Sequence, residues 1–284
     1  MKNFFIAVGK AACYVILFLV AQYAVSAAYI YGALALALIR DSSILYAADP
    51  TAINTLIEQI TLRALANQNL IYLVSAVLTV GMLTLFFRMR KKRLLQEVWA
   101  IPVRPVSLWP VVLAGIFFPL LICYGISYIP WPESALSSYD ELYNLTNDYS
   151  LLAVFTTVIA APILEEIVYR GLVFTRLCRG MPALAAAILT STVFGAMHGT
   201  LVWAAYAFVG SLALLFIYTK YRSLYASILF HMLFNLVGGF LVSYIPNLGT
   251  GFDLLMIAVS FTAVAVLAAV IWRMPRRQID KPQT

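Results

Sequence analysis

The stretch Ile163-Leu164-Glu165-Glu166-Ile167-Val168-Tyr169-Arg170-Gly171 places three charged residues inside a long apolar run. An ionisable side chain at the centre of a bilayer costs about 2.5–3.5 kcal/mol on insertion scales, so these charges need a physical reason. Arg170 follows Glu166 by four residues, which puts acid and base on one helix face in the favourable order. This spacing predicts a structural pair. Glu165 stays outside the pair, because adjacent helix positions differ by about 100° in direction.

The composition of the whole chain is that of an integral membrane protein. Of its 284 residues 63% are hydrophobic and 11% are charged, and the mean hydropathy is +0.91. Soluble domains carry roughly 25% charged residues, so a soluble globular protein is excluded. The net charge of +7 lies in short clusters beside apolar stretches. That placement follows the positive-inside rule and does not indicate a nucleic-acid partner.

Apolar stretches predict an all-α polytopic fold with about eight transmembrane helices. They lie at 11–39, 70–87, 108–129, 150–174, 182–199, 201–219, 223–243 and 252–272. Basic clusters precede the first stretch and follow the second, fourth, sixth and eighth. All clusters then fall on one side of the membrane, so both termini are expected in the cytoplasm. A secretory signal peptide is the alternative for the first stretch, but the uncharged run is much longer than a signal core.

The pattern also predicts how the remaining segments are organised. Residues 1–149 would hold N-terminal helices and loops, 150–243 the helical core with the motifs, and 244–284 the last helix and a basic tail. Segment 40–69 is expected to form an external loop with an amphipathic helix, and 94–107 an interfacial connector. The three cysteines, Cys13, Cys123 and Cys178, are too few and too far apart for a disulfide framework. Cys13 and Cys123 lie inside apolar stretches and are expected to pack there.

The only two histidines of the chain lie in apolar segments. His198 follows Phe194 by four residues in FGAMH, and His231 precedes Asn235 by four in HMLFN. If residues 180–182 form a turn, Glu165 lies about 15 residues before it and His198 about 17 after it, so antiparallel packing sets them opposite each other. His231 lies about 9 residues beyond the next basic turn and falls in the same broad layer.

A carboxylate, two histidines and an asparagine around one cavity suit hydrolysis of a peptide bond by activated water. Glu165 and a histidine would supply the general base and acid. His231 and Asn235, on one helix face, could donate N–H groups to the oxyanion. Two histidines and one glutamate also make a catalytic zinc set, so metal binding by Glu165, His198 and His231 stays open. A solvated helix end, with Arg176 and Arg179 following, is another interpretation of the three charges.

These segments resemble the CAAX-protease and bacteriocin-processing family, abbreviated CPBP or Abi, which includes the type II CAAX prenyl proteases. EEIVYR resembles its EExxxR motif, FGAMH its FxxxH motif and HMLFN its HxxxN motif. The resemblance implies an intramembrane endopeptidase with its catalytic cavity inside the bilayer. It implies that Glu165 and His198 activate water and that His231 and Asn235 stabilise the oxyanion. The remaining motif positions imply supporting roles for Glu166, Arg170 and Phe194.

The compact chain, in which the sequence indicates no sizeable extramembrane domain, suggests a multi-pass protein of a prokaryotic plasma membrane. Its substrate would be a protein or peptide at the membrane, including a lipidated one processed at its C-terminus. We expect no cofactor, with zinc as the alternative. Two other functions remain compatible with the residues: a proton- or ion-coupled transporter, in which buried charges form a relay, and a non-catalytic immunity protein with the same fold.

Overall fold

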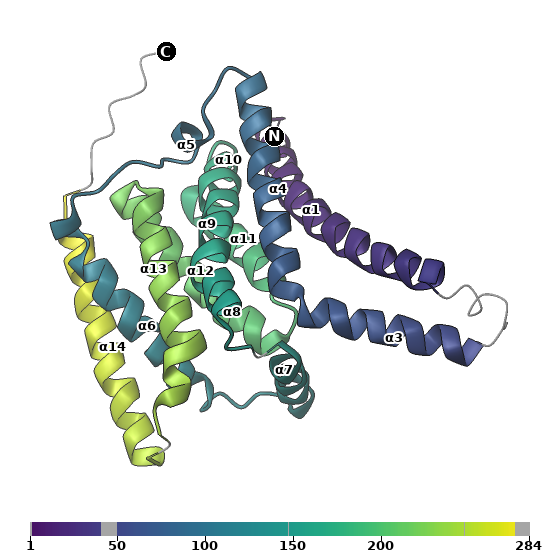
Figure 1. Ribbon diagram of the computed structural model, residues 1–284. Coiled ribbons are helices and arrows are strands. Elements are labelled where there is room, and N and C mark those ends of the chain that lie inside the picture. Colours follow the sequence, from purple (N-terminus) through teal and green to yellow (C-terminus); the bar gives the residue numbers. More distant parts are fainter. Residues whose placement is uncertain (1, 41–49, 147, 247, 276–284) are drawn as a thin grey trace.

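The computed structural model of the protein describes residues 2–40, 50–146, 148–246 and 248–275, and every regular element within these ranges is helical (Figure 1). The elements are α1 (Lys2–Arg40), α3 (Pro50–Ala66), α4 (Gln68–Met89), α5 (Leu94–Glu97), η1 (Pro105–Ser107), α6 (Trp109–Ile126), α7 (Glu133–Thr146), α8 (Leu151–Phe155), η2 (Thr156–Ala160), α9 (Ala161–Glu165), η3 (Glu166–Phe174), α10 (Thr175–Leu177), α11 (Ala183–Ala196), α12 (Leu201–Tyr221), α13 (Leu224–Leu236), η4 (Val237–Leu241), η5 (Val242–Tyr244) and α14 (Thr250–Arg273). The predicted all-α fold is confirmed for this part of the chain.

Within the described ranges, seven helices are long and apolar enough to cross a membrane, one fewer than the sequence predicted. They are α1, α4, α6, the continuous run Leu151–Leu177, α12, the run Leu224–Tyr244 and α14. The predicted fifth span, 182–199, is instead the 14-residue helix α11. At 1.5 Å per residue α11 is about 21 Å long, which is shorter than the roughly 30 Å hydrocarbon core. Apolar composition alone did not reveal this early end.

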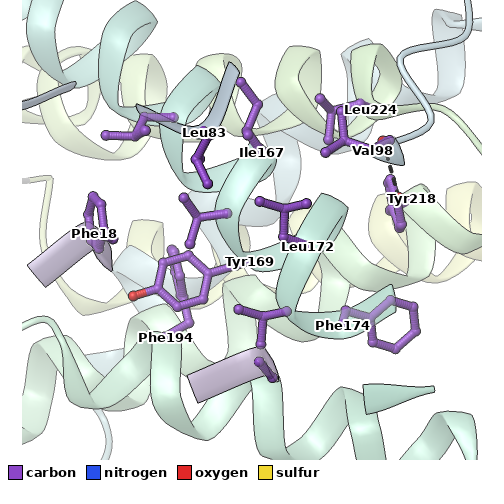
Figure 2. Packing of buried hydrophobic residues seen from close by; sticks show 14 of the residues in the cluster. Phe18, Leu83, Val98, Ile167, Tyr169, Leu172, Phe174, Phe194, Tyr218 and Leu224 are labelled. Carbon is purple, nitrogen blue, oxygen red and sulfur yellow. Dashed lines mark hydrogen bonds between the residues drawn. The ribbon is translucent and has the colours of Figure 1, made fainter. Parts of the chain in front are cut away.

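The segments between the long helices agree in part with the prediction. Segment 40–69 contains helix α3, as expected, while 41–49 lie outside the described residues. The connector 94–107 does not simply lie at an interface, because Val98 is fully buried. Tyr218 of α12 donates a hydrogen bond to the Val98 carbonyl, the dashed line in Figure 2, and the Leu224 amide donates to the Trp99 carbonyl. The connector therefore holds the ends of α12 and α13.

The run Leu151–Leu177 forms the centre of the fold. In Figure 1, α1 and α4 lie on one side of it, and α6, α13 and α14 lie on the other. Every residue from Glu166 to Phe174 is buried. Figure 2 shows apolar members of this segment packed with side chains of other helices. Glu166 and Arg170 therefore lie in the most enclosed part of the chain that the structure describes.

This central run is not a uniform α-helix. It changes to π-helical turns at η2 and again at η3, which begins at Glu166 directly after α9 ends at Glu165. A third π-helical segment, η4, continues the helix that carries His231 and Asn235. Wider turns of this kind are rare and are frequently found at functional sites. The helices of the first and the third motif both contain them.

The cysteines differ from the sequence expectation at one position. All three are free thiols, and Cys123 is partly buried next to the Gly238 carbonyl. Cys13, which was expected to pack inside its apolar span, is exposed on the surface of α1. The long apolar face of α1 has too few neighbours to cover it, so an apolar sequence position did not imply a buried one.

Close contact between α11 and α12 gives a direct test of the packing. A Cβ on Gly195 would lie 2.6 Å from the carbonyl oxygen of Ala204, whereas a Cβ on Gly81 of α4 would meet nothing within 4 Å. Gly195→Ala should therefore lower the free energy of unfolding by about 1–3 kcal/mol through overpacking. Gly81→Ala should leave it unchanged or raise it slightly, since alanine favours helix. Thermal unfolding of the two variants in detergent measures the difference, and equal melting temperatures would contradict the packing.

Candidate active site

Glu166 and Arg170 form the ion pair that the sequence predicts. Arg170 Nη1 lies 2.9 Å from Glu166 Oε1, and both side chains are 0% exposed. The guanidinium also lies over the ring of Phe194, 4.5 Å from its centroid, and donates a hydrogen bond to the Ser211 carbonyl. A buried charge persists only when it is paired and hydrogen-bonded. This burial contradicts the interpretation of Glu166 and Arg170 as part of a solvated helix end.

Glu165 has a different environment from its neighbour. Its side chain retains 17% exposure, and its Oε1 accepts a hydrogen bond from Tyr72 Oη at 3.3 Å. Tyr72 belongs to α4, so this contact joins the N-terminal helices to the motif region. The separation of the two glutamates, one enclosed and one accessible, agrees with the sequence expectation that Glu165 points elsewhere.

His231 connects the two glutamates. Its Nδ1 lies 2.9 Å from Glu166 Oε1, and its Nε2 lies 3.8 Å from Glu165 Oε2. A carboxylate oxygen only accepts, so the Nδ1 proton is donated to Glu166. Arg170, Glu166, His231 and Glu165 thus form a chain of neighbouring charges and hydrogen bonds. The sequence placed His231 in the layer of Glu165 but did not foresee its bond to Glu166.

His198 differs from the prediction in its backbone. It was expected inside a helical span, but α11 ends at Ala196 and His198 lies in the turn that leads to α12. Gly199 in the same turn has φ +84°, a conformation that favours glycine. The ring nitrogen Nδ1 lies 2.8 Å from the Phe194 carbonyl, which accepts its proton. In the neutral imidazole this leaves Nε2 with a free lone pair.

Phe194 does more in the site than fill space, because its ring contacts several of the other motif residues. Its ring centroid lies 4.8 Å from that of His198 and 6.1 Å from that of His231. Figure 2 shows Phe194 next to Tyr169. The centroids of these two rings lie 5.0 Å apart and the rings are nearly perpendicular. With Arg170 over its face, the ring contacts residues of all three motifs. It therefore fixes the spacing between the two histidines and the buried arginine.

Asn235 lies on the same helix as His231, as the spacing predicts, and its amide already has one partner. Nδ2 donates a hydrogen bond of 2.8 Å to the carbonyl of Thr157 in η2. The contact ties the helix of the third motif to the central run. One N–H of the amide remains for another acceptor. No sequence signal pointed to Thr157, which is 78 residues away along the chain.

A metal site was the open alternative for Glu165, His198 and His231. Across residues 2–40, 50–146, 148–246 and 248–275, no group of three or more His, Cys, Asp or Glu side chains is arranged to hold a metal ion. Glu165 and His231 approach each other, but His198 Nδ1 is directed at a backbone carbonyl. The described side chains therefore do not form a preassembled three-ligand site.

Tyr72 is the site residue that the sequence reasoning missed. It lies in an apolar helix among many other aromatic residues and belongs to none of the three motifs. Only the packing of α4 against the central run brings its hydroxyl to Glu165. A single tyrosine in an apolar span carries no sequence pattern that distinguishes this position from its neighbours.

The two adjacent glutamates should respond differently to the same substitution. Glu166→Gln leaves Arg170 buried without a carboxylate, so the free energy of unfolding should fall by about 3–5 kcal/mol. Glu165→Gln changes a partly exposed group that is not paired with Arg170, so the fall should stay below about 1 kcal/mol. Thermal unfolding in detergent compares them directly. Equal losses of stability would contradict the separate environments.

One family model matches the segment that carries the candidate site. Residues 147–237, about a third of the chain, match the family model described as Type II CAAX prenyl endopeptidase Rce1-like. No curated protein and no solved structure gives a match. The matched segment contains the central run, both histidines and Asn235. Over this segment the chain is similar to the type II CAAX prenyl endopeptidases, which confirms the resemblance predicted from its three motifs.

Proposed function

We propose that this protein is an intramembrane endopeptidase in which Glu165 activates the attacking water. The family match supports an intramembrane endopeptidase of CAAX type in general terms. The observation that carries the finer assignment is the contrast between the two glutamates. Glu166 is enclosed and held by Arg170, whereas Glu165 is accessible and lies between Tyr72 and His231. An accessible carboxylate beside a histidine is the arrangement that general base catalysis requires.

In the proposed reaction Glu165 takes a proton from water as the water oxygen bonds to the carbonyl carbon of the scissile peptide. The negative charge then rests on the former carbonyl oxygen. When the carbon–nitrogen bond breaks, the leaving nitrogen receives a proton and departs as an amine, and the other product is a carboxylic acid. Water is consumed once, and Glu165 ends the cycle as it began.

His198 would hold the attacking water together with Glu165. Its Nδ1 proton is committed to the Phe194 carbonyl, so Nε2 of the neutral ring can accept a hydrogen bond from water. After attack, the same nitrogen can carry a proton to the leaving amine. The position of His198 in a turn, held by the ring of Phe194, lets it approach the layer of Glu165 without belonging to a spanning helix.

His231 and Asn235 would stabilise the oxyanion, and the structure adds a condition to this role. Because Nδ1 of His231 donates to Glu166, its Nε2 can donate to an oxyanion only when the ring is an imidazolium. Asn235 would add the N–H that Thr157 leaves free. Preorganised donors of this kind typically contribute about 100- to 1,000-fold in rate.

The proposed substrate is a protein or peptide at the membrane, with processing of a lipidated C-terminus as the CAAX-type possibility. The site lies within helices that suit a bilayer, so a membrane-associated peptide reaches it more readily than a soluble one. A metal-free mechanism is proposed, because the described residues supply a base, a proton carrier and oxyanion donors. The family match favours this function over the transporter that the buried charges alone also allowed.

The catalytic assignment predicts loss of cleavage without loss of the fold. Glu165→Gln, His198→Ala and His231→Ala should each reduce turnover by about 100-fold or more, the usual effect of removing a general base, a general acid or an oxyanion donor. Comparing membrane peptides from cells with the wild type and with Glu165→Gln, by mass spectrometry, identifies products that depend on the site. A parallel arm with a chelator tests for a metal.

Glu58→Gln, an exposed substitution in α3, is the matched control and should cleave like the wild type. Full activity of the Glu165→Gln protein would overturn the assignment. Loss of products on chelation, with restoration by zinc, would replace the metal-free mechanism by a metal-dependent one.

Tyr72 should affect turnover through Glu165. Tyr72→Phe removes one donor to this carboxylate, and a hydrogen bond to a charged group contributes about 1.5–3 kcal/mol. Since the 3.3 Å contact is long, we expect a fall of about 10-fold in kcat with little change in KM. Tyr29→Phe is the control, because the Tyr29 hydroxyl accepts from Asn67 away from the motifs. Equal activity of both variants would remove Tyr72 from the site.

A further inference from the structure

A second polar site lies where α1 begins and α10 ends, outside the motif residues. The two helices pack against each other at one end of the molecule, where Figure 1 also shows the N-terminus and α5. Between them is a cavity of about 110 Å³. Four of its six lining residues are polar or basic, although the stems of these side chains and the aliphatic neighbours make most of the lining surface apolar: Asn3, Ile6, Ala7, Lys10, Arg176 and Arg179. The proposed protease mechanism uses none of these side chains.

Three cations converge on this cavity and only one of them has an acidic partner in the described part of the chain. Arg176 is buried and lies 2.6 Å from Glu97 Oε2. Burial alone would raise the pKa of Glu97, but hydrogen bonds from Lys92 and Arg176 outweigh it and lower that pKa below its ordinary value. Glu97 therefore stays charged and offsets Arg176. Lys10 and Arg179 make no ion pair with described residues, so the cavity keeps an excess of positive charge.

The walls of the cavity are held in place by close backbone packing. A Cβ on Gly180 would lie 2.8 Å from the Asn3 carbonyl oxygen and 3.0 Å from Phe4 Cα. Only glycine lets the turn after α10 approach the first turns of α1 this closely. The turn that carries Arg179 is therefore seated against the helix that carries Lys10. The charged side chains therefore line a preformed cavity between two elements. This distinguishes the site from lysines scattered over a surface.

Apolar side chains border the charged cavity on α1. Ile6 lines it and is 44% exposed, and Phe5 beside it is 68% exposed. Exposed aliphatic and aromatic groups at the end of a membrane-spanning helix contact lipid chains and the interface. A ligand with an anionic head and apolar tails would meet both features at once. A soluble phosphate would use the cations and leave the apolar border unoccupied.

We propose that this cavity binds the phosphate group of an anionic phospholipid, with its acyl chains along the exposed face of α1. Basic pockets between transmembrane helices are suited to anionic headgroups. Arginine donates to phosphate in paired hydrogen bonds, and lysine adds a point charge. The positive-inside pattern predicts that this end faces the cytoplasm, where anionic lipids are enriched. Arg176 ends the run that carries Glu165, so the lipid would contact the helix of the proposed active site.

Binding of phosphatidylglycerol to the purified full chain in detergent tests the proposal, with phosphatidylcholine and inorganic phosphate as the other probes. Native mass spectrometry should show that the wild type retains phosphatidylglycerol. Binding of this lipid should also raise the melting temperature of the protein. Lys10→Gln combined with Arg179→Gln should weaken retention by roughly 25-fold, about five-fold for each charge near a membrane surface. Arg93→Gln combined with Arg104→Gln removes two exposed charges elsewhere and should bind as the wild type does.

Each other outcome overturns the assignment. Equal loss in the two double variants would mean attraction by general surface charge. Inorganic phosphate that stabilises the protein as strongly as the lipid would mean a soluble anion site. Retention of phosphatidylcholine equal to that of phosphatidylglycerol would mean that the basic side chains do not select for an anionic headgroup. The melting temperatures of the variants and the wild type without lipid should agree. This comparison distinguishes a variant that no longer binds lipid from one that no longer folds.

Discussion

Glu166 and Arg170 carry opposite charges at the centre of an apolar bundle, and neither side chain reaches the surface. Two buried charges are tolerated only when each satisfies the other and the remaining polar contacts are made. That requirement fixes the surroundings. Phe194 covers the guanidinium, Ser211 accepts from it, and His231 donates to the shared carboxylate oxygen. One ion pair of the central run therefore holds three further helices, α11, α12 and α13, against that run.

The same ion pair shows that supporting residues and proposed catalytic residues are less separate than the motifs suggest. Glu166 is bonded both to Arg170 and to His231, so it stabilises the bundle and also sets which nitrogen of the histidine carries the proton. A residue without access to substrate can thus determine what a neighbouring residue is able to donate. Fold and reactivity share an atom here, Oε1 of Glu166.

Much of this arrangement could be predicted from residue type and spacing. The ion pair follows from a four-residue interval, and the common layer of Glu165 and His231 from distances to predicted turns. Other features depend on information that a local pattern does not hold. The early end of α11, which puts His198 in a turn, comes from packing and from Gly199. Tyr72 and Thr157 reach the site through tertiary contacts across the bundle.

The π-helical turns could not be predicted from sequence periodicity either, because every residue of η3 is buried and no exposed face marks its register. In η3 these turns begin at the boundary between Glu165 and Glu166. The two residues are chemically identical, so only their register in the helix distinguishes an enclosed carboxylate from an accessible one. Loss of a single residue in the preceding turns would move Glu166 into the position of Glu165, and gain of one would move Glu165 into the position of Glu166. The number of residues that precede the two glutamates in the helix therefore decides which of them is accessible, as much as the side chains themselves do.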